Sequence, residues 1–114
     1  MTDCLFCKIA SKEIPSDIIF EDDICIAFND IAPLAPVHFL VVPKNHIGNI
    51  SDVSKENSAV VSHIFEVISY LAKNDPKLVN GFRVVSNCGQ DAGQSVQHLH
   101  FHVLGGTKLE DKMG

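Results

Sequence analysis

His98-Leu99-His100-Phe101-His102-Val103-Leu104 places three of the six histidines of this chain at alternate positions, with apolar residues between them. An alternation with a period of two indicates a β-strand, because successive side chains of a strand point to opposite faces. The three imidazoles would share one face, and the apolar side chains would pack on the other. The sequence therefore predicts a strand over 98–104, ended by Gly105-Gly106, that is anchored in the core and presents histidines.

Three interpretations of this histidine face compete. A neutral imidazole, with an unperturbed pKa of about 6.5, can attack phosphorus without first losing a proton, while a second imidazole holds the proton that the reaction requires. The alternatives are a solvated polar face and a metal site of the His-x-His type. At roughly 3.3 Å per residue the outer pair lies about 13 Å apart along the strand. One ion bound by all three would need a strong bend, so a nucleophilic site is favoured.

The segments around the histidines predict a small mixed fold. Short apolar runs at 18–20 and 24–28, split by an acidic turn, indicate a hairpin, and further strands are expected at 38–42 and 81–86. Apolar residues recur at helical spacing over 55–73, between a possible N-cap at Ser54 and a stop at Asn74-Asp75-Pro76. A short helix is expected within 5–11. The expected fold class is α+β, with a mostly antiparallel five-stranded sheet, one main helix and a short N-terminal helix.

Composition narrows the class of protein. The 114 residues, 46% hydrophobic and 20% charged, predict a single globular domain over 1–114, with a loose tail at 107–114. A net charge of −5 without a basic run argues against long nucleic acid as a partner, but a small nucleotide needs only a local pocket. No secretory signal or membrane-spanning segment is expected, and four cysteines then indicate a reducing compartment, the cytoplasm.

Cys4 and Cys7 form a pair with the spacing Cys-x-x-Cys. Such a pair indicates either a zinc site or a redox pair. A redox pair normally precedes the helix of a thioredoxin-like βαβ unit, which this sequence does not predict. Zinc needs two further ligands, and without them the pair would be two free thiols.

The chain resembles the histidine triad (HIT) superfamily, and in particular its Hint branch. His98–Leu104 is similar to the motif His-x-His-x-His followed by two apolar residues, and the runs Gly93-Gln94-Ser95-Val96 and Leu104-Gly105-Gly106 flank it as in that branch. Further similar runs are Glu13-Ile14-Pro15, Phe20-Glu21-Asp22-Asp23, Ala27-Phe28-Asn29-Asp30-Ile31 and His38-Phe39-Leu40-Val41-Val42-Pro43-Lys44. The resemblance extends from about Cys4 to Gly106.

The resemblance implies an α+β homodimer with a purine-nucleotide site in each subunit. The implied activity is hydrolysis of a nucleoside 5′-phosphoramidate, such as AMP joined to an amine, through a nucleotidyl-histidine intermediate. By position, His100 matches the nucleophile, His102 the histidine that contacts the phosphate, and Ser95 the hydroxyl that serves the leaving nitrogen. His98 completes the triad. His38 is a candidate proton partner of these histidines.

The same resemblance implies the nucleotide-binding residues. Asp30 matches the carboxylate that holds the ribose hydroxyls, which suits a group that accepts two hydrogen bonds. Asn87 matches a phosphate contact, and Gln94 lies in the motif beside Ser95. The positions that line the base pocket are Phe6, Ile9, Phe28 and Ile31. Each of these could instead serve the turn, the loop or the core in which it lies.

The resemblance also implies a zinc site, as in relatives that have the cysteine pair. Its ligands would be two cysteines, a histidine after the third strand and the first triad histidine. The matching residues here are Cys4, Cys7, His46 and His98. Four protein ligands would make such a zinc structural rather than catalytic. No organic cofactor is expected.

Rival functions differ in chemistry or in class. A dinucleoside polyphosphate hydrolase is less favoured, because its relatives tend to follow the triad with a proline and a basic residue, where this chain has Leu104-Gly105-Gly106. A nucleotide-binding regulatory or scaffold protein with little turnover would tolerate loss of His100, whereas an enzyme would not. A metalloenzyme would bind its ion with the triad itself. The chain also has no Trp, unlike the tail of some Hint relatives, which leaves the leaving amine open.

Overall fold

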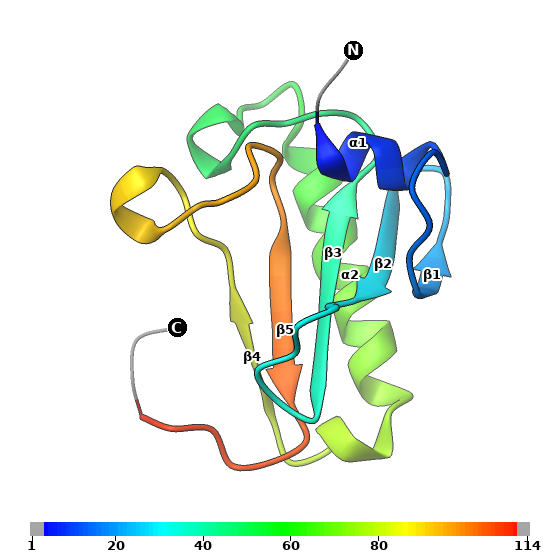
Figure 1. Ribbon diagram of the computed structural model, residues 1–114, viewed down its shortest axis with the longest axis vertical. Coiled ribbons are helices and arrows are strands. Elements are labelled where there is room, and N and C mark those ends of the chain that lie inside the picture. Colours follow the sequence, from blue (N-terminus) through cyan, green and yellow to red (C-terminus); the bar gives the residue numbers. More distant parts are fainter. Residues whose placement is uncertain (1–3, 112–114) are drawn as a thin grey trace.

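A computed structural model of the protein describes residues 4–111. Its five strands are β1 (Ile18–Glu21), β2 (Cys25–Asn29), β3 (Val37–Pro43), β4 (Phe82–Val85) and β5 (Phe101–Gly105). They form one sheet in the order β1-β2-β3-β5-β4, and every neighbouring pair is antiparallel. The expected α+β fold with a five-stranded antiparallel sheet is confirmed (Figure 1).

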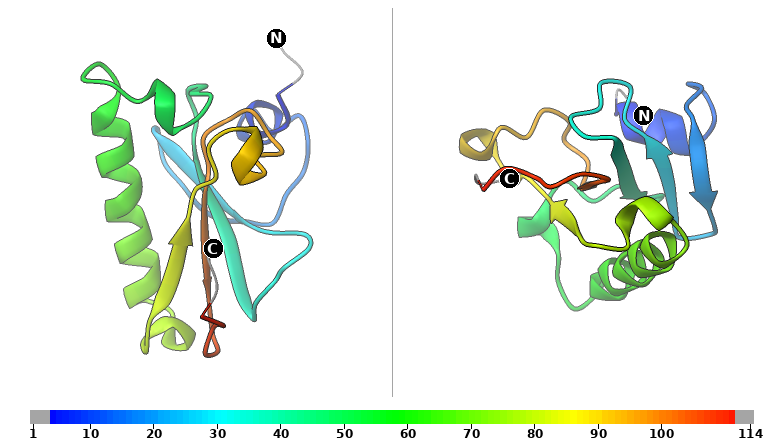
Figure 2. Two further views of the ribbon diagram at one scale, coloured as in Figure 1. Left: turned by 90° about the vertical axis from the view of Figure 1, so that its left-hand side faces the viewer. Right: turned by 90° about the horizontal axis from the view of Figure 1, so that it is seen from below.

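Two helices lie on opposite sides of the sheet (Figures 1 and 2). The long helix α2 (Ser58–Lys73) covers one side, and the short helix α1 (Leu5–Ala10) lies on the other, near the end of β3. Three short 3-10 turns complete the elements: η1 (Ile50–Asp52), η2 (Pro76–Leu78) and η3 (Gln90–Ala92). The expected main helix and short N-terminal helix are both present.

The two sides of the sheet have separate apolar clusters. On the α2 side, Leu99, Phe101 and Val103 are buried in one cluster with α2 residues that include Ile64 and Val67. On the α1 side a smaller cluster contains Phe6, Ile9, Ile26, Phe28, Leu40 and Val42. The predicted alternation therefore holds for the apolar residues, which anchor the chain from Leu99 to Val103 against α2.

The strand expected over 98–104 is shorter than predicted and begins at Phe101. Its last pair with β3 is Val41 with Phe101, and continuing that register would bring Leu99 opposite Pro43. Proline has no N–H for a sheet ladder. The Leu99 N–H instead donates to the carbonyl of Ile47 at 2.6 Å, so the chain leaves the ladder before the first two histidines.

The helix expected from about Lys55 begins at Ser58, and Asn57 rather than Ser54 is its N-cap. The Ser54 hydroxyl donates to the Glu56 carboxylate at 2.7 Å and is therefore used within a preceding turn. The end of the helix at Asn74 agrees with the predicted stop. The fourth strand also agrees, within a residue at each end.

Within the tail, which was expected to be loose, the Glu110 carbonyl accepts a hydrogen bond from the Arg83 guanidinium on β4 at 2.8 Å. Residues 112–114, which belong to the same prediction, lie outside the described part. Within residues 4–111, neither helix has the length and apolar character needed to cross a bilayer.

Candidate active site

The three triad histidines lie on the α1 side of the sheet, as the alternation predicted, although only His102 belongs to β5. The rings of His100 and His102 are 5.1 Å apart between centroids. The Phe6 ring of α1 contacts those of His98 and His100 at centroid distances of 5.9 and 5.0 Å. His98 and His100 are buried, so the site is a packed cluster of rings rather than a solvated face.

The hydrogen bond of His100 determines which of its ring nitrogens is free. His100 Nδ1 lies 2.7 Å from the His98 carbonyl oxygen, and a carbonyl can only accept. Nδ1 therefore carries the proton of the neutral ring. The lone pair is left on Nε2, which is the arrangement that a nitrogen nucleophile requires.

His102 is held in the complementary state through His38. The Leu34 N–H donates to His38 Nδ1 at 3.0 Å, so neutral His38 carries its proton on Nε2. His38 Nε2 lies 3.0 Å from His102 Nδ1 and donates to it. Neutral His102 then presents an Nε2–H. The site thus places a lone pair on His100 beside an N–H donor on His102.

Burial favours the neutral forms that this pattern needs. It lowers the pKa of His38, against a smaller opposing effect of the Asp30 carboxylate. It also lowers the pKa of His102, and His100 and His38 lower it further. Asp30 itself lies at the edge of the cluster: Oδ1 accepts from the Ala32 N–H at 2.8 Å, and Oδ2 is 3.4 Å from His38 Nε2.

Cys4, Cys7, His46 and His98 form a second cluster that shares His98 with the triad. His98 Nδ1 is 3.2 Å from Cys4 Sγ and 3.5 Å from Cys7 Sγ, and His46 Nδ1 is 3.3 Å from Cys7 Sγ. The four atoms that could bind a metal lie within 4.8 Å of one another. The structure therefore brings together residues that are 94 positions apart in sequence, as the expected ligand set required.

The chemistry of this cluster fits a tetrahedral metal. His98 Nε2 donates to the Pro43 carbonyl at 2.8 Å, which leaves the Nδ1 lone pair directed at the cysteines. Metal-binding histidines commonly fix their tautomer in this way. Burial lowers the pKa of His98 to about 4, so the ring is neutral at pH 7. Burial and the neighbouring Cys4 raise the pKa of Cys7 to about 11, so a metal would have to displace that proton.

Of the residues expected around a base, three lie together and one does not. Phe6, Ile9 and Phe28 are buried, and the Phe6 and Phe28 rings meet edge-on at 5.7 Å. Ile31 is 99% exposed in the loop after β2, so its side chain does not pack in the apolar cluster that holds the other three.

The polar residues expected around the phosphate lie in the loop between β4 and β5. Ser95 is exposed and Asn87 is half-buried. Gln94 is buried and its amide bonds within the protein: its Oε1 accepts from the Gly89 N–H, and its Nε2 donates to the Val96 carbonyl and to the Gly48 carbonyl after β3. The geometry of Gln94 thus favours shaping the loop over contacting a ligand.

The triad does not form one metal site. Among the residues of 4–111, His98 groups with the cysteines and His46, whereas His102 groups with Asp30 and His38. A metalloenzyme that binds its ion with all three triad histidines is therefore not supported by this arrangement.

Sequence reasoning missed one polar link on the α2 side of the sheet. His63 lies 2.6 Å from Asp22 and joins α2 to the β1–β2 hairpin. Burial would raise the pKa of Asp22, but hydrogen bonds from Cys25, His63 and Ile24 outweigh it and lower this pKa to about 2. The sequence held only a weak signal, an acidic hairpin turn and a histidine in a helix.

Comparison with known proteins agrees with this geometry. Residues 3–114 match the family described as "Scavenger mRNA decapping enzyme C-term binding". An uncharacterised HIT-like protein of Synechococcus elongatus is 46% identical over 94% of this chain and 93% of its own length. Among solved structures, a histidine triad protein from Clostridium difficile (50% identity, 99% and 98% of the two chains) and a HIT family hydrolase from Legionella pneumophila (42%, 98% and 100%) both superpose with a TM-score of 0.94.

A fold shared over nearly the whole chain, a histidine cluster on the α1 side and these relatives lead to one assignment. The chain belongs to the histidine triad superfamily. Its similarity to a HIT family hydrolase supports a hydrolase.

Proposed function

We propose that the protein is a nucleoside phosphoramidase of the Hint type, which cleaves the P–N bond of purine nucleoside 5′-phosphoramidates. In the first step His100 Nε2 bonds to phosphorus while the P–N bond breaks, and the amine leaves with a proton taken up from solvent, which is returned when water reacts in the second step. In the second step water cleaves the phosphorus–His100 bond, releasing the nucleoside monophosphate and free enzyme. Dividing the reaction in this way lowers each barrier.

One observation carries this proposal: His100 Nδ1 donates to the His98 carbonyl at 2.7 Å, so the Nε2 lone pair is free. Beside it, His102 carries an Nε2–H that can donate to a phosphoryl oxygen as negative charge develops. The pair therefore combines a nucleophile with an electrophilic donor.

The remaining roles rest on the family resemblance. Asp30 would accept both ribose hydroxyls, and Asn87 and Gln94 would belong to the phosphate loop. The exposed Ser95 hydroxyl would reach the leaving nitrogen, which departs poorly unless it is protonated. The apolar residues Phe6, Ile9, Phe28 and Ile31 would contact the purine.

The test is release of AMP from adenosine 5′-phosphoramidate by the wild type and by His100→Ala. We expect turnover that falls by at least about a thousandfold in the variant, because loss of a nucleophile removes the covalent route. His63→Ala is the matched control, since His63 lies on the other side of the sheet. Absence of turnover in a wild type that still binds AMP would favour a nucleotide-binding protein.

Hydrolysis of dinucleoside polyphosphates is the second candidate. The description of the matching family names an mRNA decapping enzyme. A phosphoric anhydride would present His100 with a phosphorus atom open to the same nucleophilic attack as that of a phosphoramidate. Diadenosine polyphosphate assayed in parallel distinguishes the two. A higher kcat/KM for the anhydride would replace our primary proposal.

The second part of the proposal is a structural zinc held by Cys4, Cys7, His46 and His98. Zinc bound there would cross-link α1, the loop after β3 and the chain entering β5. With four protein ligands it would have no open position for substrate. Metal analysis of the purified protein should give one zinc per chain, and Cys7→Ser should lower that content while Cys88→Ser does not.

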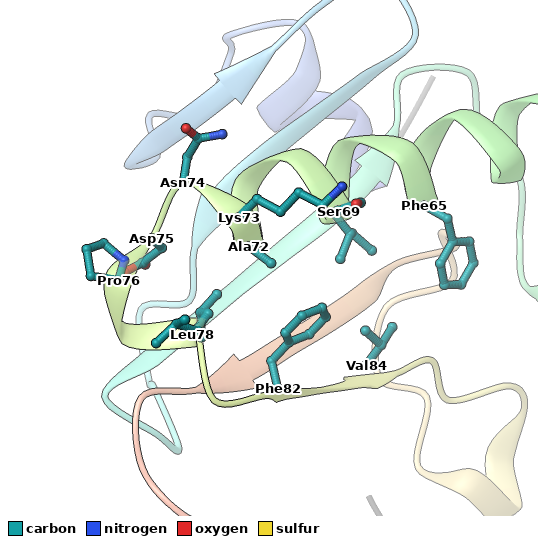
Figure 3. Close-up of a pocket in the computed structure, with 12 residues that line it drawn as sticks. Phe65, Ser69, Ala72, Lys73, Asn74, Asp75, Pro76, Leu78, Phe82 and Val84 are labelled. Carbon is teal, nitrogen blue, oxygen red and sulfur yellow. The ribbon is translucent and has the colours of Figure 1, made fainter.

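We further propose a homodimer built on β4 and α2. β4 is an edge strand, so one side of its backbone is unpaired. Beside it a groove of about 770 Å³ is lined mainly by apolar side chains, among them Phe65, Ala72, Leu78, Phe82 and Val84, with polar residues such as Lys73 and Asp75 at one end (Figure 3). A second copy would cover this groove and pair the free edge. Light scattering should give twice the chain mass, and Phe82→Glu should reduce it.

The cellular location and the extent of the domain complete the proposal. None of the four cysteines, all of which lie in the described residues, forms a disulfide, which supports a reducing, cytoplasmic environment. All five strands belong to one sheet, which supports a single domain over the whole sequence.

A further inference from the structure

His38 has one ring proton and two acceptors for it. With Nδ1 accepting from the Leu34 N–H, the proton lies on Nε2. That nitrogen is 3.0 Å from His102 Nδ1 and 3.4 Å from Asp30 Oδ2. His38 is only 4% exposed, so water hardly competes for the proton. A stronger bond to one acceptor therefore weakens the bond to the other.

The two acceptors belong to different parts of the site. Under the proposed function, Asp30 binds the sugar hydroxyls, and His102 faces the phosphate. A hydroxyl that donates to Asp30 Oδ2 would weaken the attraction of that carboxylate for the His38 Nε2–H. The same N–H would then form a stronger hydrogen bond to His102 Nδ1. Binding of the sugar at Asp30 would therefore change the hydrogen bonding of His102, at the phosphate position, through the buried His38 ring.

We propose that Asp30 is a positioning residue as well as a binding residue: a sugar diol on its carboxylate directs the His38 proton to His102, which keeps the His102 Nε2–H available to the phosphoryl group. This inference rests on the proposed function. It narrows the substrate class to nucleotides with free 2′- and 3′-hydroxyls. The hydroxyls would contribute to the rate of the chemical step and not only to affinity.

The charges around His102 give the sign of the effect. His100 and His38 both lower its pKa, and Asp30 is the group that raises it. Asp30 also raises the pKa of His38, against the larger effect of burial. Removing the charge of Asp30 must therefore lower the pKa of His102.

The first experiment follows the ring nitrogens of His102 by NMR during a pH titration of the substrate-free protein. For Asp30→Asn, which keeps an acceptor for the Ala32 N–H, we expect the pKa of His102 to fall by roughly one pH unit. Asp17→Asn is the matched control, because that carboxylate bonds to the Asn29 side chain at 2.8 Å instead. An unchanged His102 titration in Asp30→Asn overturns the inference.

A second measurement needs no variant. Wild type saturated with adenosine should show the same downward displacement of the His102 titration, whereas 2′,3′-dideoxyadenosine should not. Equal effects of the two nucleosides overturn the inference even if Asp30→Asn fails to fold.

Kinetics then tie the coupling to catalysis. With 2′,3′-dideoxyadenosine 5′-phosphoramidate we expect kcat to fall about tenfold and its pH profile to move, in addition to a higher KM. A change confined to KM contradicts the inference. If neither phosphoramidate is turned over, the proposed function has failed, while the NMR titrations still decide whether Asp30 acts on His102.

Discussion

Leu99 and His100 are neighbours in sequence but belong to the two different sides of the sheet. Leu99 is buried among apolar residues of α2 and β5, where contact is non-directional. His100 is equally buried, but it is fixed by one short hydrogen bond and by rings on either side. The α2 side is held by packing, whereas the α1 side combines a smaller apolar cluster with directed bonds between histidines, cysteines and carbonyls. Stability and chemistry are therefore expected to separate by side.

The largest expected effects come from changing these two neighbours separately. His100→Ala should reduce turnover at least about a thousandfold, with a smaller loss of stability. Leu99→Ala should lower the free energy of unfolding by about 3 kcal/mol, because it leaves a cavity in a packed cluster. Urea unfolding and single-turnover assays, run at a temperature where both variants are folded, measure the two quantities. Equal losses of stability would break the comparison.

A smaller effect is expected from removing metal, which should weaken the α1 side alone. If zinc is present at a hundredfold excess over its Kd, chelation should lower the free energy of unfolding by about 2.7 kcal/mol. Thermal unfolding with and without a chelator measures this. Cys88→Ser should lose as much stability as wild type when the metal is removed, whereas Cys7→Ser should be insensitive to the chelator.

The smallest effect is expected at the polar link between Asp22 and His63 on the α2 side. The pKa of Asp22 is lowered to about 2 from 3.8, so its contribution is present above about pH 4 and is lost as the pH falls through about 2. Because both side chains are about one-third exposed, we expect only about 1 kcal/mol for Asp22→Asn at neutral pH. Asp23→Asn, at the exposed neighbour, is the control.

Acid should also separate the two sides. In metal-free protein His98 is neutral down to about pH 4, whereas the unfolded chain takes up its proton near 6.5. The contribution of the α1 side should therefore be complete above about pH 6.5 and be lost as the pH falls towards 4. Unfolding curves measured from neutral pH down to about pH 2 would show two separate acid phases, one from His98 and one from Asp22. A single phase near pH 2 would contradict the assignment to His98.

The sequence predicted most of the fold because its signals were local. Alternation located the strands, and helical spacing located α2 to within three residues of its start. The start of β5 was missed because it depends on Pro43, a residue of another strand that cannot donate to the ladder. The N-cap was missed because the Ser54 hydroxyl bonds to Glu56 within the preceding turn.

The site was predicted less completely than the fold. The triad, the cysteine pair and His46 were identified, partly by resemblance, and the structure brings the four expected metal-binding residues together. The tautomers could not be predicted, because they depend on the carbonyls of His98 and Pro43 and on the Leu34 N–H. Almost every residue has the same backbone groups, so no sequence pattern predicts which of them will bond to a histidine ring.

The strand order has a consequence for how the molecule is made. β5 is the fifth strand in sequence, yet it lies between β3 and β4 in the sheet. During synthesis Cys4 therefore cannot contact His98 until 94 further residues have been added, and β3 has an unpaired edge until β5 is synthesised. Contacts between such distant residues slow folding and leave strand edges exposed to other nascent chains. On the ribosome a nascent chain would have neither His100 nor all four of Cys4, Cys7, His46 and His98 until the segment leading into β5 is reached, so chains that end before His98 would lack both clusters.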